Sequence, residues 1–127
     1  MTLIDRLSKL DGPDREVDAE IDRNFGLLVG IGAFSGPWTL YPDQELYKET
    51  AHYTASVDAA IALARRLWPD MMYRVGNDGE GPDTSLYLGE IFIPGEQKDS
   101  YFTGHSPVDA VSLCIAILRA KEAGRGR

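Results

Sequence analysis

The most informative segment of this chain is an apolar stretch near its C-terminus. Ser106 and Pro107 precede it, a pair typical of a helix start, where a hydroxyl caps free N–H groups and proline fits the first turn. Asp109 follows Ser106 by three residues, which predicts a capping box with Asp in place of Glu. The main apolar stripe then consists of Val108, Val111, Ile115 and Leu118. Leu113, Cys114 and Ile117 widen it, so we predict a helix that is buried on more than one side.

Two strands are predicted before this helix. Segments 71–76 and 85–94 read as strands, and the Asn, Asp, Gly and Pro residues of segment 77–83 favour a turn between them. The apolar phase slips within the second segment, and Gly89 is a natural place for a bulge that resets it. A further short strand is predicted near Tyr101 and Phe102.

Three more helices are predicted upstream. Residues 3–10 carry one apolar stripe, and residues 13–24 begin with acids that suit the positive end of a helix dipole. A third amphipathic pattern starts after Thr54 or Ser56 as the N-cap and runs to about Leu67. Segment 26–52 contains scattered glycines, and we interpret it as an irregular, well-packed connection with one short strand at most.

This order of elements predicts the α+β class. A two-stranded hairpin is marginal alone, and an alpha/beta/alpha sandwich with a small antiparallel sheet is the natural way to cover it. A chain of 127 residues is one domain's worth of sequence. We therefore expect a single domain over residues 1–127, with a frayed C-terminal tail over residues 122–127.

The net charge of the chain argues against some classes of function. Twenty acidic residues against thirteen basic ones give a net charge of −7, which argues against nonspecific nucleic-acid binding and against an anionic membrane surface. No apolar run approaches the roughly 20 residues of a membrane span, and the N-terminus holds no secretory signal. The single cysteine excludes an internal disulfide, and we expect no metal and no cofactor. These features predict a cytoplasmic protein.

Several blocks of the sequence resemble one known group. They read LIDRL at residues 3–7, GPDREVDAEI at 12–21, YTASVDAA at 53–60 and LCIAILRA at 113–120. They are similar to blocks of the phage ABA sandwich domain family, a group of small and largely uncharacterised phage and prophage proteins. The resemblance implies an alpha/beta/alpha sandwich that works in the host cell. It implies no reaction, because that family has no catalytic residues to carry over.

Candidate ligand-binding residues lie at two of the predicted helix starts. Free N–H groups and the helix dipole suit a phosphate or carboxylate there, provided that the two starts lie side by side. The alternative is that the segment around Ser106 only caps its helix. The candidates for a small anionic or nucleotide-like ligand are His52, Tyr53, Thr54, Ser56, His105 and Ser106.

Two further patterns are candidates for a partner surface. Asp14, Asp18 and Asp22 recur every four residues and would share one helix face. That face is either a solvated surface or a phosphate-mimicking surface that inhibits a host protein. The aromatic residues of segment 26–52 either pack under that segment or form a ligand wall or partner patch. They are Trp38, Tyr41 and Tyr47.

No catalytic constellation is visible in the sequence. Cys114 falls within an apolar helix face, and no serine stands in a G-x-S-x-G motif. A hydrolase that uses His105 with a nearby carboxylate is the least favoured hypothesis. We expect a small, non-catalytic phage or prophage accessory protein that acts by binding. We also expect a homo-oligomer, because a short sheet leaves an edge to cover.

Overall fold

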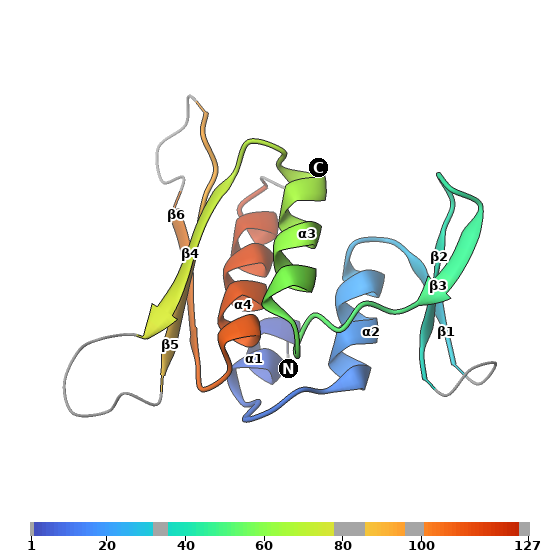
Figure 1. Ribbon diagram of the computed structural model, residues 1–127, viewed down its shortest axis with the longest axis horizontal. Helices are drawn as coiled ribbons and strands as arrows, with labels where there is room; N and C mark the ends of the chain where they lie inside the picture. The colour runs from blue at the N-terminus through green and yellow to red at the C-terminus, as the bar shows by residue number, and fades with distance from the viewer. Residues whose placement is uncertain (1, 32–35, 78–85, 96–100, 125–127) are drawn as a thin grey trace.

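Figure 1 shows a computed structural model of the chain, which describes residues 2–31, 36–77, 86–95 and 101–124. These residues form four helices and two three-stranded antiparallel sheets, which confirms the predicted α+β class. The helices are α1 (Leu3–Ser8), α2 (Arg15–Asn24), α3 (Val57–Leu67) and α4 (Asp109–Glu122). Sheet A contains β1 (Leu28–Gly30), β2 (Trp38–Tyr41) and β3 (Leu46–Glu49). Sheet B contains β4 (Met72–Asn77), β5 (Tyr87–Phe92) and β6 (Tyr101–Ser106).

The helices lie between the two sheets (Figure 1). Helix α4 packs against β5 and β6 on one side, and α2 contacts β1 and β2 on the other. The hydrophobic core is built by the helices, by sheet B and by the segments that flank them. Among the described residues, the strands of sheet A contribute no member to this core. The attachment of sheet A to the rest of the molecule therefore does not depend on the hydrophobic core.

Helix α4 is buried almost all round, as its apolar pattern predicted. It rests on two glycines, Gly89 of β5 and Gly104 of β6, which are directly paired across the sheet. A Cβ on Gly89 would lie 2.6 Å from the Leu113 nitrogen, and one on Gly104 would lie 2.3 Å from the Ser112 carbonyl oxygen. The predicted bulge at Gly89 is wrong, because the register of β5 continues unbroken through it. Gly89 is needed for the close approach of the helix backbone.

The start of α4 also differs from the prediction. Ser106 is the last residue of β6, where it pairs with Tyr87, and the helix begins at Asp109 with Val108 as its N-cap. The Ser106 hydroxyl accepts a hydrogen bond from the Val108 N–H at 3.0 Å, and no side chain caps the helix. The predicted capping box is absent because strand pairing holds Ser106. At the other end, α4 includes Glu122 of the expected tail, and residues 125–127 lie outside the described residues.

The predicted upstream helices are confirmed. Asp14 caps α2, so this helix starts at Arg15, two residues after the predicted start, and it ends at Asn24 before Gly26, whose φ is +83°. Ser56 caps α3 by accepting a hydrogen bond from the Ala59 N–H at 3.1 Å. The predicted hairpin is present as β4 and β5, although most of its turn, residues 78–85, falls outside the described residues. The strand predicted near Tyr101 is present as β6.

Segment 26–52 is a three-stranded meander, so its interpretation as an irregular connection is wrong. Its strands have only three or four residues each, which is too short for alternation to stand out in the sequence. The turn between β2 and β3 begins at Tyr41 and places Pro42 second, where the fixed φ of proline suits a type I turn. The Gln44 N–H donates to the Tyr41 carbonyl at 3.1 Å and closes this turn.

Candidate binding surface on sheet A

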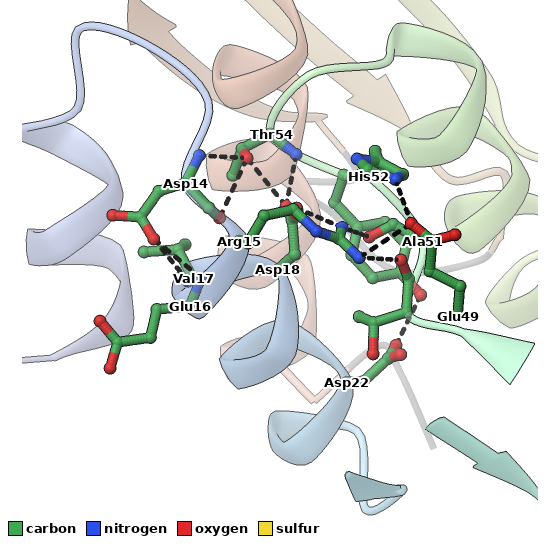
Figure 2. Close-up of polar contacts among 12 residues, drawn as sticks. Asp14, Arg15, Glu16, Val17, Asp18, Asp22, Glu49, Ala51, His52 and Thr54 are labelled. Carbon is green, nitrogen blue, oxygen red and sulfur yellow. Dashed lines mark hydrogen bonds and ion pairs between the residues drawn. The ribbon is translucent and has the colours of Figure 1, made fainter. Parts of the chain in front are cut away.

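A buried polar network joins α2 to sheet A. Asp18 and Asp22 lie on the inner face of α2, and both are fully buried. Asp18 accepts hydrogen bonds from the N–H and the hydroxyl of Thr54, both at 2.8 Å, and from the Arg15 guanidinium at 2.8 Å (Figure 2). Charge-assisted hydrogen bonds of this kind are about twice as strong as neutral ones. The carboxylate therefore locks the segment before α3 onto α2.

Asp22 extends this network into sheet A. Its carboxylate accepts hydrogen bonds from the Thr39 hydroxyl at 2.7 Å and from the Tyr53 hydroxyl at 2.5 Å. The Thr39 proton points to Asp22, so the Thr50 hydroxyl donates to Thr39 over 2.8 Å. Burial, reinforced by the negative charge of Asp22, raises the pKa of Tyr53 well above its usual range. The network thus keeps Tyr53 protonated as a donor.

Arg15 completes the attachment of sheet A. Its guanidinium donates to the carbonyl oxygens of Thr50 at 2.7 Å and Ala51 at 3.2 Å, and it lies 3.6 Å from the Glu49 carboxylate. Figure 2 shows this side chain reaching from α2 to the strand end and the segment that follows it. Every buried side-chain nitrogen and oxygen among the described residues has a hydrogen-bond partner. The network is saturated, as structural networks are.

This burial corrects the acidic-face prediction. The four-residue spacing does place Asp18 and Asp22 on one side of α2, but that side faces inward. Neither a solvated surface nor a host-protein surface is formed by these two carboxylates, because neither is exposed. Asp14 caps the helix by accepting hydrogen bonds from the N–H groups of Glu16 and Val17. Apart from Arg15, the donors that hold Asp18 and Asp22 come from residues 39–54, which the sequence did not place beside α2.

The two faces of sheet A differ in an unusual way. Side chains alternate along a strand, so the buried Thr39 marks the inner face of β2. The residues that share the opposite, outer face are Leu28, Gly30, Trp38, Leu40, Tyr47 and Glu49. Leu28 is 59% exposed and Tyr47 is 56% exposed. An antiparallel sheet normally turns its polar side to water, whereas here the solvent side is apolar except for Glu49.

Two aromatic rings form the centre of this outer face. The indole of Trp38 lies across Gly30, where an added Cβ would come within 2.1 Å of a ring carbon. The Tyr47 ring stands beside it at 5.0 Å between centroids and an angle of 76°. Tyr41 points to the other side of the sheet, where the cations of Lys48 and Arg66 approach its ring. The structure therefore joins Trp38 and Tyr47 and separates them from Tyr41.

The structure places the predicted ligand residues at the helix starts in different environments. Tyr53, Thr54 and Ser106 are at most 2% exposed, and Ser56 is the cap of α3. Because neighbours in a strand point to opposite faces, His105 lies on the far side of sheet B from Ser106 and α4. His52 contacts Glu49 at 2.8 Å beside sheet A. His105 is thus a residue of β6, whereas His52 follows β3 outside the strands, and a shared site for the two stays a prediction.

The outer face of sheet B combines exposed apolar side chains with charged ones. Met72 is 58% exposed and Tyr101 is 62% exposed, and Tyr101 contacts Phe92 with ring centroids 4.7 Å apart. An ion pair of 3.3 Å between Arg74 and Glu90 crosses the middle of the face. These residues line a shallow hollow of about 180 Å³.

The described residues contain no cluster of His, Cys, Asp and Glu that is suited to a metal ion. None of the helices in the described part of the chain combines the length and apolar character that a membrane crossing requires. Comparison with protein-family models, curated proteins and solved structures finds no match to this chain.

Proposed function

We propose that this chain is a small, non-catalytic phage or prophage accessory protein that acts by binding, with the outer face of sheet A as its recognition surface. The observation that carries the proposal is the polarity of this sheet. Its fully buried strand residue is Thr39, whereas Leu28 and Tyr47 are more than half exposed. Removing apolar surface from water is favourable by about 25 cal/mol per Å², so a partner gains affinity by covering this face.

The hydrogen bonds that attach sheet A to α2 support the proposal. Arg15, Asp22 and Thr39 hold β2 and the end of β3 in place through directional hydrogen bonds. A surface that is already fixed before binding loses less conformational entropy when the partner arrives. The aromatic pair of Trp38 and Tyr47 is thereby presented in one arrangement.

Cys114 is a buried core residue, as its place in an apolar helix face predicted. Burial raises the pKa of the Cys114 thiol far above its usual range, and its Sγ donates to the Tyr53 carbonyl at 3.4 Å. The thiolate, which is the reactive form, is therefore not populated at neutral pH.

Selection from a displayed library of random peptides tests the proposal. Tyr47→Ser removes a ring from the outer face, and the matched control Leu46→Ser changes its neighbour on β3, which points to the opposite face. We expect enriched peptides that bind the unmodified protein and the Leu46 variant equally and lose affinity for the Tyr47 variant. Enriched peptides that ignore Tyr47→Ser, or no enrichment at all, would contradict the proposal.

A second proposal concerns self-association, and the exposed face of sheet B favours it. Three strands of six residues present a surface of about 20 Å by about 14 Å. Stable interfaces cover about 800 Å² on each partner, so this face suits a weak dimer of two copies of the chain. A two-fold axis through the face would also bring Arg74 of each copy near Glu90 of the other.

A further inference from the structure

We infer that the ligand of the outer face of sheet A is a short proline-rich segment with basic flanks. This inference rests on the proposed function and names the class of partner for the same surface. Three properties of the surface lead to it: its size, the arrangement of its two aromatic rings, and the charges around it.

The size of the face selects a short peptide. Strands of three or four residues in a three-stranded sheet give a face of about 13 Å by about 14 Å. This is far below the roughly 800 Å² per partner of a stable protein–protein interface. A polyproline II segment advances about 3.1 Å per residue, so four or five residues cross the whole face. The dimensions of the face therefore match a short segment of chain.

The rings of Trp38 and Tyr47 favour proline within that segment. The indole lies across Gly30, and the Tyr47 ring contacts it edge to face with centroids 5.0 Å apart and an angle of 76°. A compact, non-aromatic ring such as the pyrrolidine of proline packs against the exposed surface of such an aromatic pair. Aromatic surfaces recognise proline-rich segments in this way, because the polyproline II helix is formed before binding and loses little entropy. Leu28 and Leu40 extend the apolar surface beside the rings.

The charges around the face favour basic flanks on the ligand. Glu49 belongs to the outer face and its side chain is 66% exposed, with Arg15 at 3.6 Å and His52 at 2.8 Å from its carboxylate. Asp43 and Glu45 are both exposed in the turn that joins β2 to β3. Lys48, the cation of β3, belongs to the inner face. Arginine or lysine beside the prolines would thus meet an acidic rim, and these contacts would weaken as salt screens them.

Other ligands of aromatic surfaces fit less well. Single-stranded nucleic acid stacks on aromatic rings but also requires positive charge along its backbone, whereas this rim is acidic and the chain carries −7. A saccharide stacks on an indole but needs several hydrogen-bonding groups around its hydroxyls, and the described outer face offers Glu49, the Tyr47 hydroxyl and the Trp38 indole N–H.

Nuclear magnetic resonance titration of the full-length, isotope-labelled protein tests the inference. The probes are an arginine-flanked oligoproline peptide, a glutamate-flanked oligoproline peptide and a chito-oligosaccharide. We expect the arginine-flanked peptide to shift the Trp38 indole signal and to bind about tenfold more tightly than the glutamate-flanked one. The Trp38 signal is distinguished from that of Trp68 by its loss in Trp38→Phe.

Substitutions in sheet A test where the arginine-flanked peptide binds. Tyr47→Ser and Leu28→Ser should each weaken the arginine-flanked peptide about tenfold, whereas Leu46→Ser should leave its affinity unchanged. The α4 signals report whether each variant is folded, and Leu28→Ser serves if the Tyr47 variant is not. Equal affinity for the two peptides, or a shift of Trp38 with the saccharide alone, would overturn the inference.

The peptide selection distinguishes failure of the proline-rich ligand from failure of the proposed binding surface. Enriched sequences that depend on Tyr47 but lack proline would refute the proline-rich ligand and leave the binding surface standing. Loss of any Tyr47-dependent ligand would refute both.

Discussion

At the scale of single residues, the two buried aspartates of α2 are the most informative. Each accepts hydrogen bonds from side chains or backbone more than fifteen residues away in sequence, and each is fully buried. A period of four identifies a helix face, but it does not tell which side of the helix meets water. Charged residues normally occupy the side that faces water, and the donors from residues 39–54 reverse that expectation here. No local signal in the sequence reveals those partners.

The Asp18 carboxylate should be important for stability. Asp18→Ala removes the acceptor for a buried Thr54 N–H and hydroxyl and for the Arg15 guanidinium. We expect a loss of about 3 kcal/mol in the free energy of unfolding, measured by urea titration. Glu16→Ala changes an exposed carboxylate of the same helix and should cost less than about 0.5 kcal/mol. Equal effects of the two substitutions would show that Asp18 does not hold the network.

Tyr53 should give the fold an alkaline limit. Its pKa is raised in the folded protein by burial and by Asp22, and that of Tyr41 is raised mainly by burial. The stabilisation from a raised pKa is complete below the unfolded value near 10 and decreases as pH rises above it. Tyr53→Phe removes one such group, so unfolding free energy should fall less steeply above about pH 10 than in the unmodified protein. An unchanged slope would contradict the buried position of this hydroxyl.

At the scale of elements, the sequence predicts the helices and strands that are long and periodic, and it misses the strands that are short. The four helices and the strands of sheet B follow from apolar spacing and from cap residues such as Ser56. Sheet A was missed because three-residue and four-residue strands carry little periodicity. A sequence signal was present nonetheless, because the turn residues Pro42 and Asp43 separate the short segments WTLY and LYKE. These two segments pair as β2 and β3.

The contact between α4 and sheet B should tolerate no side chain at its glycines. A Cβ on Gly104 would lie 2.3 Å from the Ser112 carbonyl oxygen and 2.7 Å from the Ile115 Cβ. Gly104→Ala should therefore lower the free energy of unfolding by about 3 kcal/mol or prevent folding. Gly76→Ala is the matched control, because an added Cβ there meets nothing within 4 Å. Calorimetry of the two variants checks this expectation, and similar melting temperatures would refute the close packing.

At the scale of the whole molecule, two sheets with apolar side chains exposed on their outer faces lie on opposite sides of a helical layer (Figure 1). The two faces differ in what supports them. Sheet B rests on the hydrophobic core through Ile91 and its neighbours, whereas sheet A is held by the network of Arg15, Asp18 and Asp22. The candidate surface on sheet A could not be predicted because its exposure depends on this network. Trp38 and Tyr47 were identified as aromatic candidates, but their pairing requires the meander.

Self-association is a property of the whole molecule. The exposed Met72 and Tyr101 of sheet B predict a dimer that dissociates on dilution and is weakened by Tyr101→Ser. Sedimentation equilibrium over a range of concentrations measures this directly, with Tyr47→Ser on the other sheet as the control. A monomer at the highest concentration, or a dimer that is unaffected by Tyr101→Ser, would exclude sheet B as the interface.

The central claim is that sheet A turns its aromatic face to water and its threonines to the body. Nuclear magnetic resonance with a soluble paramagnetic probe tests it, since the probe broadens the signals of side chains that it can approach. The account predicts strong broadening for Leu28 and Tyr47 and protection for the methyl groups of Thr39 and Thr50. Protected Leu28 and Tyr47 signals together with broadened threonine methyl signals would contradict it.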